Sequence, residues 1–346
     1  MNRTYTVESV TSGHPDKICD QISDAVLDEC LRQDPKSRVA VESFGGHGIL
    51  IIGGEVTTSA QFDAEKISGD VYRNIGYEQN LKIITNIVRQ SPDIAMGVDA
   101  GGAGDQGIMY GYATNQTSEY LPDAVVKVHA LAEGLEKMRR SGLSWIKPDG
   151  KTQITVKEGK TVSVLVSTQH SADKDQNFIK AELTEKLIKP IIGEVSGLEI
   201  LVNPTGRFVQ GGFEADTGLT GRKIMVDTYC GLLPHGGGCF SGKDPSKVDR
   251  SAAYMTRFAA KNIVANGLAR TCLVSVAYAI GRAEPLMVEA INENGESLAE
   301  LVKSKFDFRP RAIIERLNLL RPIYFKTAAY GHFGKEGLPW EEVVSI

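Results

Sequence analysis

Apolar residues along the chain switch between the spacing of a helix and the spacing of a strand. Ile18, Ile22 and Val26 recur every four residues, which places them on one face of a helix. The stretches that follow are β-branched or alternating, with the turn-forming sequence GGHG between them. In the first third, this pattern predicts a helix over residues 16–32, strands over residues 38–44 and 48–59, and a helix over residues 61–75.

The same succession recurs in the middle and last thirds. Pro122 suits the first turn of a helix, and Glu158 and Gly159 separate two alternating runs as a hairpin turn does. The middle third is predicted to contain helices over residues 122–140 and 175–189, and a hairpin over residues 152–157 and 161–167. The last third is predicted to contain helices over residues 247–266 and 297–305, and strands over residues 271–280 and 285–291.

Helix, strand pair and helix, repeated three times, predict an α+β fold. We expect three similar α+β domains related by a pseudo-threefold arrangement, each a β-sheet covered by helices. The repeat is too long for a solenoid. The alternative is a coincidence within one large α+β protein, since no identity between the thirds is visible by eye.

Length and composition describe a globular protein. The 346 residues are too many for one ordinary core and enough for two or three. Hydrophobic residues make up 42% and charged residues 24%, the balance of a soluble protein. No apolar run approaches the roughly 18 residues of a membrane span, and the N-terminus lacks the apolar stretch of a signal peptide. We expect no membrane partner.

Cysteine usage and charge narrow the environment further. Five scattered cysteines without a Cys-x-x-Cys pair argue against a disulfide framework and a zinc site. They predict a reducing, cytoplasmic location. The net charge of −4 gives no general reason to expect a nucleic-acid partner. A local concentration of Lys and Arg therefore needs its own explanation.

Two glycine-rich loops resemble known phosphate-binding motifs only in part. GAGDQG at residues 102–107 fits G-x-G-x-x-G, but a strand-like stretch follows it where a dinucleotide-binding loop opens a helix. GGCFSGKD at residues 237–244 is close to a Walker A loop, with Asp244 where Ser or Thr is required and no apolar strand before it. Phosphate binding through Lys243 remains an interpretation of the second loop. A glycine-rich turn with a solvated lysine is the alternative.

Cations gather around the second loop. Arg222 and Lys223 precede Lys243, and Lys247 and Arg250 follow it, which gives five cations within thirty residues. Most of them lie in predicted loops rather than along one helix face. A mildly acidic chain with such a cluster is predicted to bind a polyanion.

Acidic residues and a histidine accompany these cations. His14, Asp16 and Lys17 lie at the start of the first predicted helix, where phosphate binds well, although an Asp there can be a simple cap. Asp216 and Asp249 flank the cationic stretch, and such carboxylates suit magnesium shared with phosphates. We find no Ser-His-Asp, Cys-His or His-Glu-x-x-His arrangement, so the sequence favours charge stabilisation over nucleophilic catalysis.

Four stretches together resemble the S-adenosylmethionine synthetases (methionine adenosyltransferases). They are ESVTSGHPDKI at residues 8–18, GAGDQGIMYGY at residues 102–112, NPTGRF at residues 203–208 and GGGCFSGKD at residues 236–244. The resemblance covers nearly the whole chain, in order. It implies an N-terminal domain over residues 1–90, a mobile active-site loop over residues 91–104, a central domain over residues 105–208 and a C-terminal domain over residues 209–346. It also implies a homodimer, or a dimer-of-dimers homotetramer, with active sites at the dimer interface.

The resemblance implies a reaction that agrees with the residue inventory. In this family the methionine sulfur attacks C5′ of ATP, and the released triphosphate is hydrolysed to pyrophosphate and phosphate. A neutral sulfur has no proton to lose, so the step needs cations and an aligned sulfur rather than a general base. The implied substrates are ATP and L-methionine, and the implied cofactors are Mg²⁺, two per active site, and K⁺.

Site residues are carried over from the resemblance position by position. The catalytic residues implied are His14, Lys151, Arg222 and Lys243. The ATP-binding residues implied are His14, Asp149, Lys151, Arg207, Phe208, Asp216, Arg222, Lys223, Cys239 and Lys243. The methionine-binding residues implied are Glu55, Gln90, Asp105, Asp216 and Lys247. Asp16 and Asp249 are implied as magnesium ligands, and Glu42 as the potassium-linked carboxylate.

The chain also departs from the family pattern. The predicted mobile loop is shorter before Gly102 than in many bacterial members, and residues 44–47 differ from the commoner sequence. From the family pattern we would expect a C-terminal extension after residues 339–342, and the sequence given has only four further residues. Two other functions remain open on the residues: an ATP-dependent phosphotransferase that would release ADP, and a nucleotide-binding regulatory subunit that has lost turnover.

Overall fold

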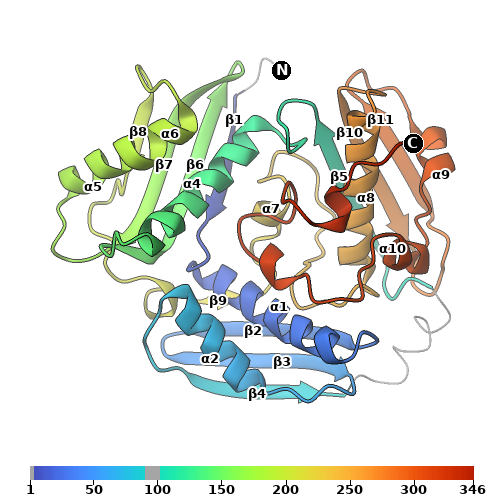
Figure 1. Ribbon diagram of the computed structural model, residues 1–346, viewed down its shortest axis with the longest axis horizontal. Coiled ribbons are helices and arrows are strands. Elements are labelled where there is room, and N and C mark those ends of the chain that lie inside the picture. Colours follow the sequence, from blue (N-terminus) through green and yellow to red (C-terminus); the bar gives the residue numbers. More distant parts are fainter. Residues whose placement is uncertain (1–3, 90–101) are drawn as a thin grey trace.

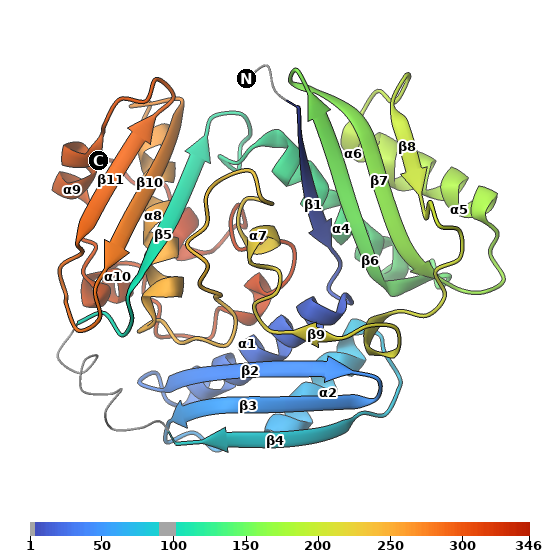
Figure 2. The same ribbon diagram turned by 180° about the vertical axis from the view of Figure 1, so that it is seen from behind.

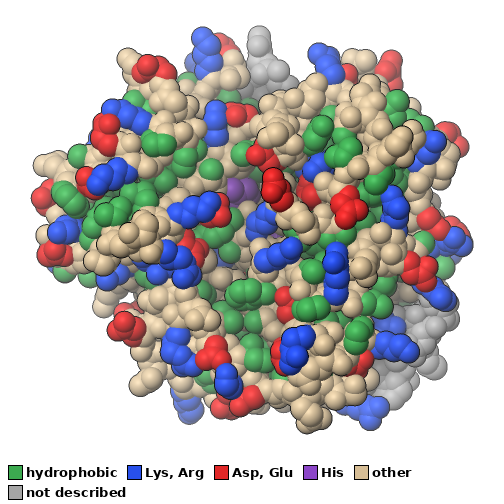
Figure 3. Space-filling view, in the orientation of Figure 1, with side chains coloured by type: hydrophobic (Ala, Val, Ile, Leu, Met, Phe, Trp, Pro, Cys, Tyr) green, Lys and Arg blue, Asp and Glu red, His purple; other side chains and the backbone are tan. Residues whose placement is uncertain are grey.

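The computed structural model describes residues 4–89 and 102–346, and its strands form three separate sheets. Helices lie on one side of each sheet, and they face the viewer in Figure 1. Seen from behind in Figure 2, the sheets turn their other faces outward around a central region of loops. Figure 3 shows acidic and basic side chains interspersed over the helix-bearing side.

The first sheet has the strand order β4-β3-β2-β9. β2 and β3 are an antiparallel pair, β4 runs parallel to β3, and β9 pairs antiparallel with β2. The strands are β2 (Arg38–Gly46), β3 (Ile49–Thr57), β4 (Lys82–Val88) and β9 (Gly218–Leu219). Helices α1 (Pro15–Gln33) and α2 (Ala64–Ile75) cover this sheet.

The second sheet has the order β1-β6-β7-β8. Its strands are β1 (Thr4–Val10), β6 (Ile146–Lys157), β7 (Lys160–His170) and β8 (Glu199–Val202). It is covered by α4 (Asp123–Arg140) and by a second helical stretch of α5 (Gln176–Leu183), the π-helical turn η1 (Thr184–Ile188) and α6 (Lys189–Ile192).

The third sheet has the order β11-β10-β5. Its strands are β5 (Gly107–Thr114), β10 (Thr271–Tyr278) and β11 (Met287–Asn292). The helices of this unit are α8 (Val248–Ala265), α9 (Ala299–Lys305) and α10 (Pro310–Arg316). Short helical turns lie in the loops between β8 and α8, namely η2 (Gly212–Glu214) and α7 (Ile224–Asp227), and in the C-terminal segment after α10, namely η3 (Phe325–Thr327) and η4 (Pro339–Glu341).

Each sheet contains one strand from another segment of the chain. β1 comes from the N-terminal third and pairs with β6, β5 comes from the middle and pairs with β10, and β9 comes from the last third and pairs with β2. This cyclic exchange ties the three units together. It also brings the central loops between β8 and α8 against α1.

Two hydrophobic cores stabilise the molecule. The larger core joins the first and third units and contains Ile18, Leu50 and Phe258, whereas the second unit has its own core around Ile154. The C-terminal segment packs on the larger core, where the Trp340 ring stacks on Tyr254 with centroids 3.7 Å apart. The three units therefore have two cores between them, within the two or three that the chain length allows.

The expected α+β fold is confirmed, with differences at particular elements. The helix predicted from residue 61 begins at Ala64, because the Asp63 carboxylate caps it by accepting the Lys66 amide at 2.9 Å. The helix predicted over residues 175–189 contains the π-helical turn η1. Strands β1, β4 and β8 and helix α10 were not predicted. Within residues 4–89 and 102–346, none of the helices has the length and apolar character needed to cross a bilayer.

Candidate active site

Helix α1 carries four aspartates that hold the central loops. Successive ones are four residues apart, about one helical turn, so they lie on one face of the helix. Asp16, Asp20, Asp24 and Asp28 accept backbone hydrogen bonds from Leu219 at 3.0 Å, Gly221 at 2.9 Å, Gly242 at 2.8 Å and Phe325 at 2.8 Å, in that order. The acidic face of one helix thereby fixes loops about 200 residues or more away in the sequence.

The first set of charged site residues gathers at the N-terminus of α1, and we call it the α1 group. The Asp16 carboxylate, 1% exposed, pairs with Lys223 at 2.6 Å and Arg222 at 3.3 Å. Burial pushes the pKa of Asp16 up, but hydrogen bonds from Lys223 and a backbone amide outweigh it, and the pKa is lowered. The α1 group comprises His14, Asp16, Lys151, Arg222 and Lys223.

His14 caps α1 as a neutral ring. Its Nδ1 accepts the backbone N–H of Asp16 at 3.2 Å, so the ring proton belongs on Nε2. Burial, together with the charges of Lys223 and Lys151, lowers the pKa of His14 to about 3. At neutral pH the imidazole therefore offers an Nε2–H donor rather than a positive charge.

The second set lies around the glycine-rich loop, residues 236–244, and we call it the glycine-loop group. Lys243 pairs with Asp249, at the start of α8, at 2.6 Å. Burial opposes the Lys243 charge, but Cys239, Asp249 and Glu42 outweigh it and raise the pKa of Lys243. Burial raises the pKa of the Cys239 thiol to about 11, so this sulfur is not a thiolate at neutral pH. The group comprises Glu42, Glu55, Cys239, Lys243, Lys247 and Asp249.

Two glycines explain why this loop needs its composition. A Cβ on Gly238 would lie 2.2 Å from the Asp249 carboxyl carbon. Gly242 has φ +77°, and a Cβ there would lie 1.9 Å from the Val41 carbonyl oxygen. Larger residues would push the loop away from both partners. The motif thus serves a close approach of the loop to an acidic side chain and to β2.

The glycine loop extends the first sheet and places its lysine on a particular face. Lys243 forms an antiparallel bridge with Ala40 of β2, and Ala40 pairs on its other side with Glu55 of β3. Residues paired across a sheet point their side chains to the same face. Glu42 lies two residues from Ala40 and shares this face as well. Lys243, Glu42 and Glu55 therefore lie on the helix-free side of the sheet.

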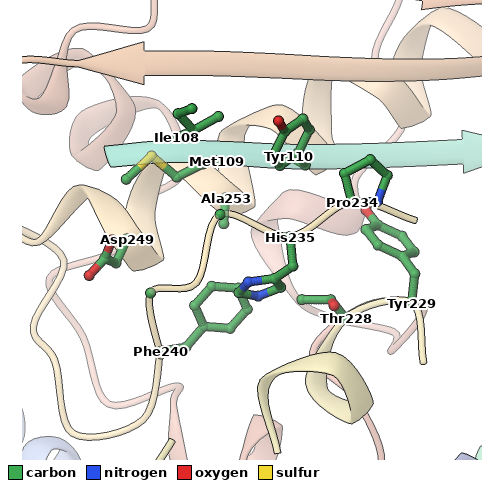
Figure 4. A pocket seen from close by; sticks show the side chains of 12 residues that line it. Ile108, Met109, Tyr110, Thr228, Tyr229, Pro234, His235, Phe240, Asp249 and Ala253 are labelled. Atoms are coloured by element: carbon green, nitrogen blue, oxygen red, sulfur yellow. The ribbon is translucent and has the colours of Figure 1, made fainter. Parts of the chain in front are cut away.

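The pocket beside the glycine loop is small. Figure 4 shows Asp249 and Met109 on one side of it, with Phe240 and His235 across from them. Its volume is about 10 Å³, whereas sites for small molecules usually measure some 300–1,000 Å³. A nucleotide would therefore need a surface beyond this pocket.

Of the other predicted residues, Asp149 is near enough to Lys151 of the α1 group for their charges to interact. The Asp149 carboxylate accepts the N–H of Gly212 at 2.8 Å, and burial raises the pKa of Asp149 to about 6. The charge of Asp216 contributes to this raised pKa, so Asp216 lies near Asp149. Phe208 pairs through its backbone with His170, whose N–H donates to the Phe208 carbonyl at 2.9 Å.

The remaining predicted residues are less well connected. Lys247, although part of the glycine-loop group, forms its ion pair with Asp244, which belongs to neither group. For Asp105 and Arg207, no hydrogen bond or ion pair to either group occurs in the described part of the chain. Gln90 and the predicted mobile loop as far as residue 101 lie outside the described residues.

Buried ion pairs behind both groups were not predicted from the sequence. Asp24 and Arg250, both 0% exposed, pair at 2.7 Å, and this carboxylate also holds the glycine loop. Lys17 contacts Asp20 at 2.8 Å and also Asp227. The four-residue spacing of the α1 aspartates was a visible signal, but their partners come from distant segments.

Magnesium ligands were predicted at Asp16 and Asp249. Outside residues 1–3 and 90–101, no cluster of three or more His, Cys, Asp and Glu side chains is arranged to hold a metal ion. Asp16 and Asp249 each stand as a single carboxylate beside lysines. That donor set suits magnesium held jointly with phosphate oxygens, because magnesium commonly binds proteins through only one or two carboxylates.

Fold and site together define an α+β enzyme whose charged loops suit a polyphosphate substrate. Models of the three S-adenosylmethionine synthetase domains match the chain in order: the N-terminal domain over residues 2–92, the central domain over residues 100–208 and the C-terminal domain over residues 210–342. The S-adenosylmethionine synthase of Pseudothermotoga lettingae is 49% identical over an alignment 387 positions long, covering 100% of this chain and 98% of that protein. The chain belongs to the S-adenosylmethionine synthetase family and is a methionine adenosyltransferase.

Proposed function

We propose that the enzyme makes S-adenosylmethionine from L-methionine and ATP by direct displacement. The methionine sulfur bonds to C5′ as the C5′–O5′ bond breaks, and the triphosphate leaves with the electron pair. The triphosphate is then hydrolysed to pyrophosphate and phosphate. The convergence of Lys223, Arg222 and neutral His14 around Asp16 carries this proposal, because such a set stabilises a departing polyanion without supplying a base.

The residues of the two groups take different parts in this step. In the α1 group, the Nε2–H of His14 donates to the oxygen that leaves C5′, and Lys151 and Arg222 supply charge to the phosphates. In the glycine-loop group, Lys243 stabilises the leaving triphosphate, and Glu55 orients methionine. We retain the other ATP and methionine contacts expected from the resemblance as part of the proposal.

Magnesium and potassium complete the proposed site. Asp16 and Asp249 would hold Mg²⁺, two per active site, and Glu42 would be linked to K⁺. When bound, these ions neutralise charge on the triphosphate. Both carboxylates now pair with lysines, Lys223 and Lys243. With Mg²⁺ held by these carboxylates, Lys223 and Lys243 would be free to contact phosphate oxygens.

We further propose that two copies of the chain form each site, in a homodimer or a dimer-of-dimers homotetramer. The helix-free face of the first sheet exposes Phe44 at 42%, Ile51 at 39% and Ile84 at 40%. Exposed apolar patches that are contiguous and rimmed by polar groups are typical of protein interfaces. Glu55 and Lys243 lie on this same face, so an interface there would bring the glycine-loop group of one copy to the α1 group of the other.

Subunit complementation tests the shared site. Asp16→Asn disables the α1 group and Lys243→Ala the glycine-loop group, and each variant alone should be nearly inactive. In a mixed dimer with twofold symmetry, one of the two sites then receives only wild-type groups. Unfolding and refolding the two variants together should restore about a quarter of wild-type activity. Activity no higher than the sum of the separate variants would show that each chain forms its own site.

Reaction products separate the proposed function from its rivals. With ATP and methionine, the enzyme should yield S-adenosylmethionine, pyrophosphate and phosphate. ADP as a methionine-independent product would indicate a phosphotransferase, and the absence of turnover a regulatory subunit. For location, we propose the reducing cytoplasm, in keeping with five cysteines that are all free.

A further inference from the structure

The backbone of the loop that carries His14 forms hydrogen bonds with side chains from three different segments. Gln21 of α1 donates to the Ser12 carbonyl at 2.7 Å. Tyr77, after α2, donates to the Gly13 carbonyl at 2.7 Å. Tyr330, in the C-terminal segment, accepts the Ser12 amide at 3.1 Å. The position of His14 is thus set by hydrogen bonds to the two residues that precede it.

Tyr330, Ser12 and Glu136 form a closed ring of hydrogen bonds. The Tyr330 hydroxyl accepts the Ser12 amide and donates to the Glu136 carboxylate of α4. The same carboxylate oxygen accepts the Ser12 hydroxyl at 2.8 Å. Arg140 donates to the other oxygen of Glu136 at 2.6 Å. Both polar groups of Ser12 that can donate are therefore fixed, two residues before His14.

The backbone and the surroundings of Tyr330 show that this arrangement is built rather than incidental. Tyr330 has φ +60°, in the left-handed region that bulky residues rarely adopt. Burial raises the pKa of its hydroxyl, and the Glu136 carboxylate raises it further, so the hydroxyl keeps its proton. Strained residues of this kind persist where the surrounding structure over-determines them, often near functional sites.

The ring also forms part of the wall of a large hollow on the helix-bearing side. This hollow, of about 630 Å³, is lined by Ser12, Glu136 and Tyr330 together with parts of α2 and the C-terminal segment. Acidic and basic side chains are interspersed on this side of the molecule (Figure 3). Removing one hydroxyl from Tyr330 therefore leaves space around it and forces no overpacking.

We propose that Tyr330 is a positioning residue for the reaction: with Glu136 and Ser12 it fixes the loop that aims His14 at the leaving group. The inference rests on the proposed function of His14. His14 shifts when the Ser12 segment shifts, because the His14 amide donates to Thr11 at 3.1 Å within the same turn. We assign Tyr330 itself no contact with substrate.

Tyr330→Phe tests the inference, because it removes the hydroxyl and keeps the ring. The single-turnover rate of S-adenosylmethionine formation should fall about 10- to 100-fold, since small misplacements of a catalytic group are that costly. The KM for ATP should change less than about threefold, because the cations that hold the phosphates stay in place. Ser12→Ala, which keeps the backbone donor, should cause a smaller loss. The Tyr330→Phe/Ser12→Ala double variant should lose little more than Tyr330→Phe alone, since both act through one ring.

Tyr324→Phe is the matched control. Tyr324 lies in the same C-terminal segment, is fully buried and donates its hydroxyl to the Leu319 carbonyl at 2.6 Å. Both variants should lower the melting temperature, but only Tyr330→Phe should slow the chemical step. Equal rates for the two variants, at temperatures where both are folded, would overturn the positioning role.

His14→Asn distinguishes a failure of this inference from a failure of the proposed function. If His14→Asn loses activity and Tyr330→Phe stays within threefold of the wild-type rate, only the positioning role is wrong. If His14→Asn itself stays within threefold of the wild-type rate, the function of His14 is wrong, and the inference about Tyr330 fails with it. Loss in both, with the rate and KM separated as described, supports the two together.

Discussion

Replacing Lys243 by Ala removes the cation that we assign to the leaving triphosphate while leaving its loop in place. The backbone on either side is held independently, since Asp24 accepts the Gly242 amide at 2.8 Å and Arg250 donates to the Lys243 carbonyl at 3.0 Å. The Lys243 side chain is 23% exposed, so its charge acts in a medium less polar than water. The variant therefore reports on charge rather than on folding.

The size of the effect follows from Coulomb's law. Two unit charges about 4 Å apart interact by about 4 kcal/mol at an effective dielectric constant of about 20. Removing one preorganised donor from an oxyanion costs about 2.7–4 kcal/mol, or about 10²–10³ in rate. Charge on the leaving oxygen grows only as the C5′–O5′ bond breaks. Lys243→Ala should thus lower kcat by about 10²–10³ and change the ATP KM much less.

Rapid-quench measurement of S-adenosylmethionine in a single turnover is the suitable assay. Lys243→Arg should recover part of the rate, because its planar fork places the charge differently. Asp249→Asn is needed as a companion, since Asp249 loses its partner at 2.6 Å when Lys243 is replaced. A single-turnover rate for Lys243→Ala within threefold of wild type would refute the assignment of this loop to the leaving group.

Other predictions concern metals, stability and pH. Turnover should stop in excess EDTA. Wild-type activity should be higher in potassium than in sodium, and Glu42→Gln should abolish this preference. Equal wild-type rates in the two salts would contradict the Glu42 assignment. Asp24→Asn should lower the free energy of unfolding by about 3–5 kcal/mol, because it leaves the Arg250 charge buried without its partner. Urea denaturation measures this loss, and a loss below about 1 kcal/mol would show that this pair is not stabilising. Burial, with Lys335 and Lys17, lowers the pKa of His129 to about 3 in the folded protein, and the unfolded chain binds this proton near pH 6.5. Stability should therefore fall as pH drops from about 6.5 towards 3, and His129→Gln should flatten that slope in thermal melts at stepped pH.

Apolar spacing and turn residues predicted the helices and hairpins that depend on neighbouring residues. The period of Ile18, Ile22 and Val26 located α1, and the turn at Glu158 and Gly159 located the β6–β7 hairpin. Both depend on residues near one another in the chain. Local pattern could not show that β1, β5 and β9 join sheets formed mainly by other segments. Strand pairing over such distances is decided by packing rather than by local spacing.

The charged residues of the candidate site could be predicted, but not the hydrogen bonds that hold its loops. Lys243 and Asp249 stood out by motif and flanking charge, and they do pair at 2.6 Å. The ring of Tyr330, Glu136 and Ser12 has no motif, because its members are 124 to 318 residues apart. Its hydrogen bonds can only be read from a folded chain.

The product mixture of a single turnover tests whether an intact triphosphate is displaced from C5′. Enzyme in excess over ATP, with L-methionine, Mg²⁺ and K⁺, is quenched at increasing times and analysed by mass spectrometry. Displacement at C5′ should give S-adenosylmethionine and triphosphate first, with pyrophosphate and phosphate appearing as the triphosphate is consumed. Pyrophosphate or phosphate formed from ATP before S-adenosylmethionine, or ADP as the nucleotide product, would contradict displacement of an intact triphosphate from C5′.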